Sequence, residues 1–385
     1  MFITKKIKKC IILNILLCIP SLTFANIPDA PSVKAKSYVL MDYDTGDILD
    51  ELNPDTILPP ASLTKVMTAY VVFNELERDN LKLTDTVRIS KKAWKTSGSK
   101  TFIKEGDDVL VEDLIKGMII HSGNDASVAL AEHIAGSVER FSELMNYEAK
   151  NLKMENSHFE NPTGLPIKNH YTTARDLSIL TRAMIQKFPK YYYIYQLKQF
   201  TYADITQQSR NRLLKEDLGF DGLKTGYTNA AGYCYIGSAK RDDRRLIVTL
   251  MGEPSPEQRF EDAKSLVNFG FRFYEKHTVL EKNKAIEELT TQVYNGVTDN
   301  LYIGTNKDVV LVLERGQINK IKYDVDLIKV AKAPIESNQK VGTIKVMLND
   351  TVLETVDLIN LNEIKEGSWV KKIKDYMNIK LRKSN

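Results

Sequence analysis

Four pairs of residues in the chain have the spacing Ser-x-x-Lys, which could place a hydroxyl beside an amine. They are Ser62/Lys65, Ser97/Lys100, Ser337/Lys340 and Ser368/Lys371. Only Ser62 begins a segment with strong helical periodicity, and residues i and i+3 of a helix share a face. The start of a helix also offers free N–H groups where a negatively charged oxygen would form. We therefore predict that Ser62 is a nucleophile that forms an acyl-enzyme and that Lys65 is its base.

A lysine accepts a proton near neutral pH only when its pKa is lowered, which partial burial and a second cation both achieve. The second cation is available in Lys224-Thr225-Gly226, the only such tripeptide in the chain, on a predicted strand. Its glycine would allow the backbone of a substrate to approach closely, as an added strand requires.

A third group, Ser122-Gly123-Asn124, is predicted to begin a second helix. The Ser122 hydroxyl could relay a proton to a leaving amine, while the Asn124 amide orients the substrate. Ser-x-Asn is common by chance, and Ser209-Arg210-Asn211 is a second match. The prediction therefore depends on the occurrence of all three motifs in this order, each at the end of a predicted helix or strand.

Each of these residues also has a plainer interpretation. Lys65 could be a solvated helix lysine, Asn124 an N-terminal cap and Arg210 a surface residue in a polar loop. Taken singly, the plain interpretation is favoured for Asn124 and Arg210, but not for all the motifs together. Other hydrolytic chemistries are poorly supported, because the chain contains no His-Glu-x-x-His and no Gly-x-Ser-x-Gly. His121 is expected to pack beside Ser122, and no metal or cofactor is predicted.

Periodicity indicates the elements that position these residues. Segments 38–43 and 47–50 flank a turn and predict a hairpin. Helices are predicted from Ser62 to about Arg78, over 124–135, over 173–187 and over 257–276, and antiparallel strands are predicted within 221–252. Strands at both ends of a largely helical middle indicate an α/β layer fold for a catalytic domain over residues 26–282.

The C-terminal third has a different pattern. From residue 283 to 367, short alternating segments predict a small all-β domain. In the final segment, 368–385, Trp369, Val370, Ile373, Met377 and Leu381 share one face, and basic residues occupy the other. This pattern predicts an amphipathic helix whose residues 369–385 anchor the chain to a membrane surface; the alternative is a helix docked on its own domain.

Residues 1–25 are predicted to be a signal peptide, because four lysines precede an apolar run that is too short to span a membrane, followed by Thr23-Phe24-Ala25. Its removal lowers the formal charge from +4 to zero, which gives no support for a nucleic-acid partner. Cys10 and Cys18 are lost with it, so no intramolecular disulfide can form. Cys234 lies in an apolar run and is predicted to be a buried thiol.

At these motifs the chain resembles the low-molecular-mass penicillin-binding proteins, specifically the D-alanyl-D-alanine carboxypeptidases with a C-terminal β domain and an amphipathic anchor. Penicillin-binding proteins and class A β-lactamases carry a similar trio, with Asp where this chain has Gly123. The likeness covers nearly the whole predicted mature chain, including residues 60–68, 122–126, 161–165, 210–211 and 221–228.

The resemblance implies a serine DD-peptidase fold like that of β-lactamases, in which an antiparallel sheet packs against a helical subdomain. It implies removal of the terminal D-alanine from a peptidoglycan pentapeptide stem, with β-lactam antibiotics as covalent inhibitors. It also implies a location on the periplasmic face of the inner membrane.

Carried over residue by residue, the resemblance makes Ser62 the group that attacks the carbonyl of the penultimate D-alanine, with Lys65 taking its proton. Ser122 and Lys224 would pass a proton to the departing D-alanine.

The remaining roles concern binding. Asn124 would hold the peptide amide, Thr225 and Arg210 would meet the terminal carboxylate, and Gly226 belongs to the substrate-binding strand. The backbone N–H groups of Ser62 and Tyr227 would form the oxyanion hole. Tyr227 stands where related members have histidine, which leaves the hole intact because only the N–H is used.

Three alternatives stay open. A β-lactamase would need a carboxylate that activates water, and the Glu-x-x-Asn match from Glu143 to Asn146 is expected on a solvated helix face. A D,D-endopeptidase that cuts cross-links would use the same residues. A membrane-bound binding module that has lost its chemistry is opposed by the intact nucleophile, base and triplet.

Overall fold

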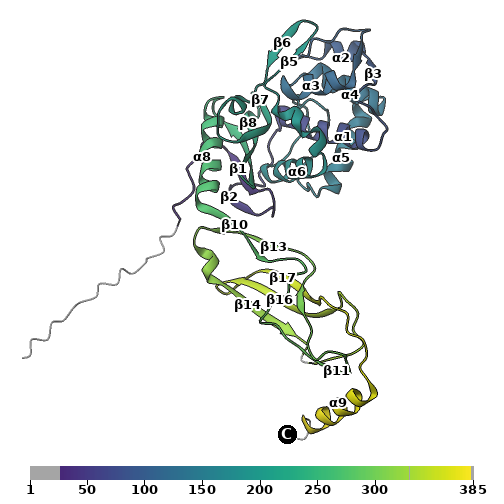
Figure 1. Cartoon of the computed structure of the whole chain (residues 1–385). Helices are drawn as coiled ribbons and strands as arrows, with labels where there is room; N and C mark the ends of the chain where they lie inside the picture. Colours follow the sequence, from purple (N-terminus) through teal and green to yellow (C-terminus); the bar gives the residue numbers. More distant parts are fainter. Residues whose placement is uncertain (1–26, 329, 383–385) are drawn as a thin grey trace, which may run out of the picture.

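The computed structural model describes residues 27–328 and 330–382. Figure 1 shows an N-terminal part that contains most of the helices, followed by an elongated β domain with the last helix at its far end. The predicted signal peptide, with Cys10 and Cys18, lies outside the described residues.

The N-terminal part is built on a five-stranded antiparallel sheet with the order β2-β1-β9-β8-β7. Alternate residues of its central strands enter different cores, because successive side chains of a strand point to opposite faces. In β9, for example, Ile247 belongs to the core shared with the helical region, whereas Leu246 and Val248 pack on the other face, beneath α8. The strands are β1 (Ser37–Asp42), β2 (Ile48–Leu52), β7 (Phe220–Thr228), β8 (Gly232–Arg241) and β9 (Arg244–Glu253).

The helical region fills the chain between β2 and β7 (Figure 1). Its central helix α1 is buried on every side, not along one stripe, which is typical of a helix in the core of a large domain. Two small two-stranded sheets, β3 with β4 and the hairpin β5–β6, also belong to this region. The elements are η1 (Ala61–Leu63), α1 (Thr64–Glu77), β3 (Thr86–Arg88), α2 (Lys91–Lys95), β4 (Asp108–Leu110), α3 (Val111–Ile120), α4 (Asn124–Ala135), α5 (Val138–Asn151), α6 (Ala174–Lys187), α7 (Pro189–Tyr192), η2 (Tyr193–Gln196), β5 (Gln199–Tyr202), β6 (Ile205–Gln208) and η3 (Arg212–Lys215).

The helix predicted over 257–276 is shorter in the structure. Helix α8 (Gln258–Phe273) ends where β10 (Tyr274–Leu280) begins, without an intervening loop. Strand β10 pairs with β13 of the β domain, and this long-range backbone pairing overrides the helical pattern of the sequence. Strand β10 therefore joins the two parts of the molecule.

The β domain has its own core, centred on a four-stranded sheet of order β12-β17-β16-β14. A parallel pair, β11 with β15, and the β10–β13 pair complete it. Its elements are β11 (Gln292–Tyr294), β12 (Ile303–Thr305), β13 (Val309–Glu314), η4 (Gln317–Lys320), β14 (Ile321–Leu327), β15 (Val330–Lys332), β16 (Lys340–Leu348) and β17 (Thr351–Asn360).

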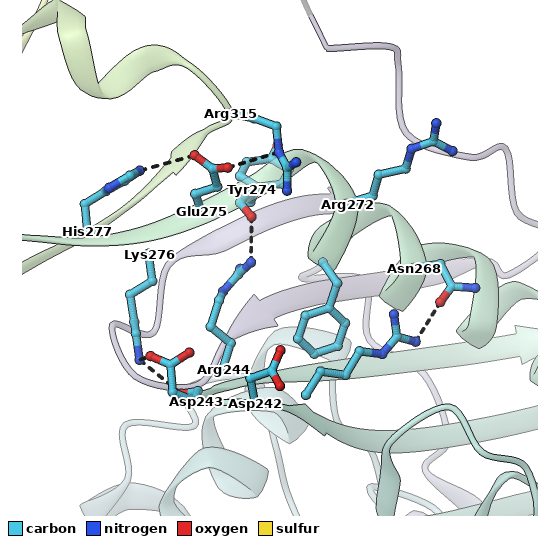
Figure 2. A pocket seen from close by; sticks show the side chains of 12 residues that line it. Asp242, Asp243, Arg244, Asn268, Arg272, Tyr274, Glu275, Lys276, His277 and Arg315 are labelled. Atoms are coloured by element: carbon cyan, nitrogen blue, oxygen red, sulfur yellow. Dashed lines mark hydrogen bonds and ion pairs between the residues drawn. The ribbon is translucent and has the colours of Figure 1, made fainter.

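Ion pairs cross the junction between the two parts, around a cavity of about 800 Å³ (Figure 2). Lys276 of β10 binds Asp44 in the β1–β2 turn and Asp243 in the β8–β9 turn, at 2.9 and 3.0 Å. Arg315, which follows β13, binds Glu275 at 3.1 Å. These contacts add to the β10–β13 pairing in fixing the β domain against the sheet.

The chain ends with α9 (Trp369–Arg382), which is present as predicted. Its Asp375 is buried and accepts hydrogen bonds from the Asn295 backbone and from Lys371, at 2.6 and 2.7 Å. Its apolar side chains, by contrast, are exposed, up to 73% for Trp369; the others are Val370, Ile373, Tyr376 and Met377. Within the described residues, no helix is both long and apolar enough to cross a membrane.

Candidate active site

Ser62 lies in the short helix η1, immediately before α1. The preceding residue, Ala61, has a left-handed backbone with φ of 47°, so the chain turns sharply at the nucleophile. Gly164 packs against this turn so closely that a Cβ there would lie 1.7 Å from the Ala61 carbonyl oxygen. Gly164 also has φ of 83°, so a side chain at this position is excluded twice over.

Lys65, one turn later, points at Ser62. Its Nζ donates to Ser62 Oγ at 3.1 Å, to Asn124 Oδ1 at 2.7 Å and to the Thr163 carbonyl at 2.7 Å. The three acceptors come from η1, from the start of α4 and from the loop after α5, so three separate segments fix one amine. This arrangement leaves the Lys65 amine within reach of the Ser62 proton.

Lys65 is 1% exposed, because it lies on the buried helix α1. Burial, followed by the nearby positive charge of Arg210, lowers the pKa of Lys65 to about 7, while Asp125 acts in the opposite direction. A substantial fraction of Lys65 is therefore neutral near pH 7, and a neutral amine can act as a base.

A second buried lysine lies at the other end of the site. Lys224 is 2% exposed, and its Nζ donates to Ser122 Oγ and to its neighbour Thr225 O, each at 2.9 Å. Burial lowers the pKa of Lys224 well below its usual value, and the charges of Lys65 and Arg210 lower it further. Ser122, which has φ of 69°, thus accepts a hydrogen bond from an ammonium group that releases its proton more readily than an ordinary lysine.

Strand β7 carries this lysine along the open edge of the sheet, since β7 is the last strand in the order. A Cβ on Gly226 would lie 3.2 Å from the Ser62 nitrogen and 3.3 Å from the Ala61 Cβ. The edge strand therefore passes directly beside Ser62. A peptide added to this edge would bring its carbonyl to Ser62.

Three of the predicted binding residues differ in how they are held. Asn124 is the first residue of α4 and not its cap; its Oδ1 accepts from Lys65 and its Nδ2 donates to the Ser97 carbonyl at 2.7 Å. Thr225 is buried. Arg210 is exposed, yet its charge reaches both buried lysines, as their pKa values indicate.

Tyr227 follows the triplet with its ring 49% exposed. The ring stacks on Tyr233 of β8 with centroids 4.3 Å apart, and its hydroxyl donates to Asn229 Oδ1 at 2.8 Å. The Tyr227 side chain therefore contacts Tyr233 and Asn229, and the backbone N–H is the group of this residue that could contribute to an oxyanion hole.

Comparison with known proteins places this arrangement in a family. A family model described as D-alanyl-D-alanine carboxypeptidase matches residues 24–255, and one described as penicillin-binding protein 5, C-terminal domain, matches residues 274–366. The chain belongs to the D-alanyl-D-alanine carboxypeptidase family.

Relatives agree over most of the length. The carboxypeptidase DacC of Escherichia coli is 40% identical over 91% of this chain and 90% of its own. The crystal structure of penicillin-binding protein 5 from Haemophilus influenzae is 37% identical, covers 88% of this chain and 100% of that chain, and has a TM-score of 0.79. Penicillin-binding protein D2 of Listeria monocytogenes, solved in an ampicillin-bound form, is 30% identical over 64% of this chain and 100% of its own, with a TM-score of 0.59. The resemblance and the fold class predicted from the sequence are confirmed.

Residues that the motif analysis left without a role also shape this carboxypeptidase. Asn161 Oδ1 accepts from the Thr163 N–H, the Thr163 hydroxyl and the Gly164 N–H at 2.7 to 3.0 Å, and its Nδ2 donates to the Leu165 carbonyl. This single amide sets the turn that presents the Thr163 carbonyl to Lys65. The signal was available in the Asn-Pro-Thr-Gly-Leu segment, but its spacing does not reveal which atoms meet.

Two further charged residues, Asp125 and Arg259, form hydrogen bonds that position the segments carrying the motifs. Asp125 accepts from the backbone N–H groups of Thr101 and Phe102 at 2.8 to 3.0 Å, which ties the loop before β4 to the start of α4. Arg259 of α8 donates to the Gly226 carbonyl at 3.2 Å from beneath the sheet. No local sequence pattern indicates either contact, because each joins segments far apart in the chain.

The structure also shows where the residues of the β-lactamase alternative, Glu143 and Asn146, lie, together with His121 and Cys234. Glu143 is exposed on α5, and the Asn146 side chain is engaged with the Phe159 backbone on both sides, at 2.8 Å. Within the described residues, neither side chain forms a hydrogen bond with Ser62 or Lys65. His121 is half-buried beside the Gln208 carbonyl. Cys234 is fully buried, and burial raises its pKa to about 11, as expected for a core thiol.

Proposed function

We propose that this serine-type D-alanyl-D-alanine carboxypeptidase removes the terminal D-alanine from peptidoglycan pentapeptide stems through an acyl-enzyme on Ser62. The observation that carries this proposal is the buried Lys65 amine, 3.1 Å from Ser62 Oγ, with its pKa lowered to about 7. It supplies a neutral base at a serine whose backbone nitrogen lies beside Gly226 of the open edge strand.

In the first step, Lys65 accepts the Ser62 proton while Ser62 Oγ attacks the carbonyl carbon of the penultimate D-alanine. The carbonyl oxygen becomes an anion that the N–H groups of Ser62 and Tyr227 stabilise, an effect worth about 10² to 10³ in rate for one donor in a comparable site. The close approach of Gly226 to the Ser62 nitrogen supports this placement of the two N–H groups.

The bond to the terminal D-alanine then breaks, and its nitrogen must receive a proton. The Ser122 hydroxyl donates this proton and recovers one from Lys224, to which it is bound at 2.9 Å. Arg210 and Thr225 receive the terminal carboxylate at the Ser122 end of the site, and Asn124 holds the peptide amide. Water then adds to the ester carbonyl and loses a proton, which passes through Ser122 to Lys224, and the departing Ser62 oxygen recovers the proton held by Lys65.

The direct test is D-alanine release from a purified pentapeptide, with the Ser62→Ala variant as control. We expect release by the native enzyme and none above background by the variant. Offered beside a cross-linked dimer, the pentapeptide also separates carboxypeptidase from endopeptidase activity. Preferential cleavage of the dimer would favour the endopeptidase.

We further propose that β-lactams trap the enzyme, because no carboxylate within residues 27–328 and 330–382 is hydrogen-bonded to Ser62 or Lys65, where a β-lactamase would need one to activate water. Incubation with benzylpenicillin should give a long-lived adduct whose mass maps to Ser62. Rapid turnover of the antibiotic by purified protein would contradict this.

Export and membrane attachment are part of the same proposal. We propose that residues 1–25 direct export and are removed, that residues 26–282 form the catalytic domain and 283–367 the β domain, and that 368–385 attach the enzyme to the periplasmic face of the inner membrane. The exposed apolar residues of α9, Trp369 to Met377, support attachment, since a helix docked on its own domain would bury them. Removal of α9 should release the enzyme from lipid vesicles without loss of D-alanine release.

A further inference from the structure

A cavity of about 380 Å³ lies beside the segment just before Ser62, on the side that the catalytic groups do not occupy. Its walls come from the segment just before Ser62, from the loop after Gly164 and from the end of β7, with Pro60, Leu165, Ile167, Lys168, His170 and Thr228 among the lining residues. Ile167 is 56% exposed at its rim. The cavity therefore opens beside the nucleophile with mainly apolar walls.

The positions of residues along strand β7 show on which side of Ser62 the cavity lies. Alternate residues of a strand share a face, so Lys224, Gly226 and Thr228 point the same way, about 7 Å apart from one to the next. Lys224 reaches Ser122, Gly226 lies against Ser62, and Thr228 lines the cavity. Ser62 thus separates the Ser122 end, where the amine departs, from the cavity.

The part of a substrate that stays on the enzyme as the acyl group must extend away from the departing amine. On this strand, that direction leads from Gly226 to Thr228 and into the cavity. The cavity is therefore placed to meet the acyl portion of the stem.

Two lining residues of the cavity can carry charge, and only one is free to do so. His170 Nδ1 accepts from the Glu160 N–H at 3.0 Å, so its Nε2 carries the proton and donates to Thr64 Oγ1 at 2.8 Å. Burial lowers the pKa of His170 to about 4, which keeps it neutral. Lys168 is exposed, and none of the hydrogen bonds or ion pairs of the described residues involves its amine. The rim of the cavity is accordingly cationic.

We propose that this cavity binds the acyl portion of the stem peptide and that Lys168 pairs with a carboxylate carried by that portion. The inference rests on the proposed function, and it names a feature of the substrate that the Ser62 chemistry leaves open. An aliphatic segment ending in a carboxylate fits apolar walls with one cation at the rim, whereas a segment ending only in an ammonium group would meet repulsion.

Two stem carboxylates have this chemistry. One is the side-chain carboxylate of a diaminodicarboxylic acid at the third position, and the other is the α-carboxylate of the D-glutamate that precedes it. Pentapeptides in which one or the other carboxylate is converted to an amide distinguish the two sources.

The test measures how well each pentapeptide slows the acylation of Ser62 by fluorescent penicillin, a readout of binding that does not require turnover. We expect amidation of the relevant carboxylate to weaken protection by about two- to fivefold in the native enzyme, the range for an ion pair at an exposed site. Lys168→Gln should weaken protection by the free acid to the same extent and abolish the difference between acid and amide. Lys168→Arg should restore it.

Lys150→Gln, an exposed lysine on α5, is the matched control and should leave the difference unchanged. Acylation by penicillin alone should be equal in all variants, which checks that they fold. An acid-to-amide ratio that is the same in the native enzyme and in Lys168→Gln would overturn the inference. Release of D-alanine, measured in parallel, reports separately on the proposed function.

Discussion

The two sides of Ser62 differ in the chemistry of their side chains. On the side of the departing amine, Lys65 is hydrogen-bonded to Ser62, Lys224 is hydrogen-bonded to Ser122, and the charge of Arg210 lowers the pKa of both lysines. On the opposite side, prolines, a glycine and aliphatic residues surround one exposed lysine. Proton transfer needs groups whose pKa values are shifted by burial and by each other. Recognition of the acyl portion needs only shape and a charge at the rim, so substitutions on the two sides should change different measurements.

The largest effect is expected from Lys65→Arg on the charged side. Arginine keeps the positive charge but cannot lose its proton, so the base is removed while the charge is retained. We expect the rate constant for acylation by penicillin to fall on the order of 10³-fold, within the range for a general base. Lys65→Met should fall similarly. An arginine variant that keeps a tenth of the native rate would show that Lys65 acts through its charge alone.

A smaller effect is expected from Asn161→Ala, which tests the turn that links the two sides. The alanine variant loses the acceptor of three hydrogen bonds, each worth about 0.5 to 1.5 kcal/mol. We expect a loss of roughly 2 to 4 kcal/mol in the free energy of unfolding, measured with urea, and slower acylation because the Thr163 carbonyl is no longer fixed. Asn161→Asp keeps the acceptor and should lose less on both measures.

The pH dependence gives a third test of the charged side. The acylation rate should rise with pH through a midpoint near 7, because Lys65 must be neutral to accept the proton. In Arg210→Gln the midpoint should move upward, since a positive charge that favours neutral Lys65 has been removed. It should stay well below the usual lysine value of 10.5, because burial is the larger cause. An unchanged midpoint would show that the charge of Arg210 does not influence the pKa of Lys65.

The smallest effect is expected from Tyr227→Ala. The alanine keeps the backbone N–H, so acylation by penicillin should change by no more than about threefold, far less than the 10² to 10³ that loss of an oxyanion donor costs. A larger loss would assign the Tyr227 ring a part in positioning the strand through its stack on Tyr233.

The sequence predicted the three motifs and the elements that carry them, because helices such as α4 and strands such as β7 have strong local periodicity, but helix α3 was missed. It could not predict that α1 is buried on all sides, which is what lowers the pKa of Lys65. The hairpin β5–β6 and the strand β10 were also missed, since their pairing depends on partners distant in sequence. For the same reason, Asn161, Asp125 and Arg259 became visible only when the chain was folded.

The buried state of Cys234 has a practical consequence. It is the only cysteine after residue 25, and its raised pKa leaves it almost wholly in the unreactive thiol form at neutral pH. In protein from which residues 1–25 have been removed, a cysteine introduced on the surface would therefore be the sole site for thiol-directed dyes or cross-linkers. Cys234 would not have to be replaced first. Paired labels on the sheet and the β domain would then report how the two move in solution.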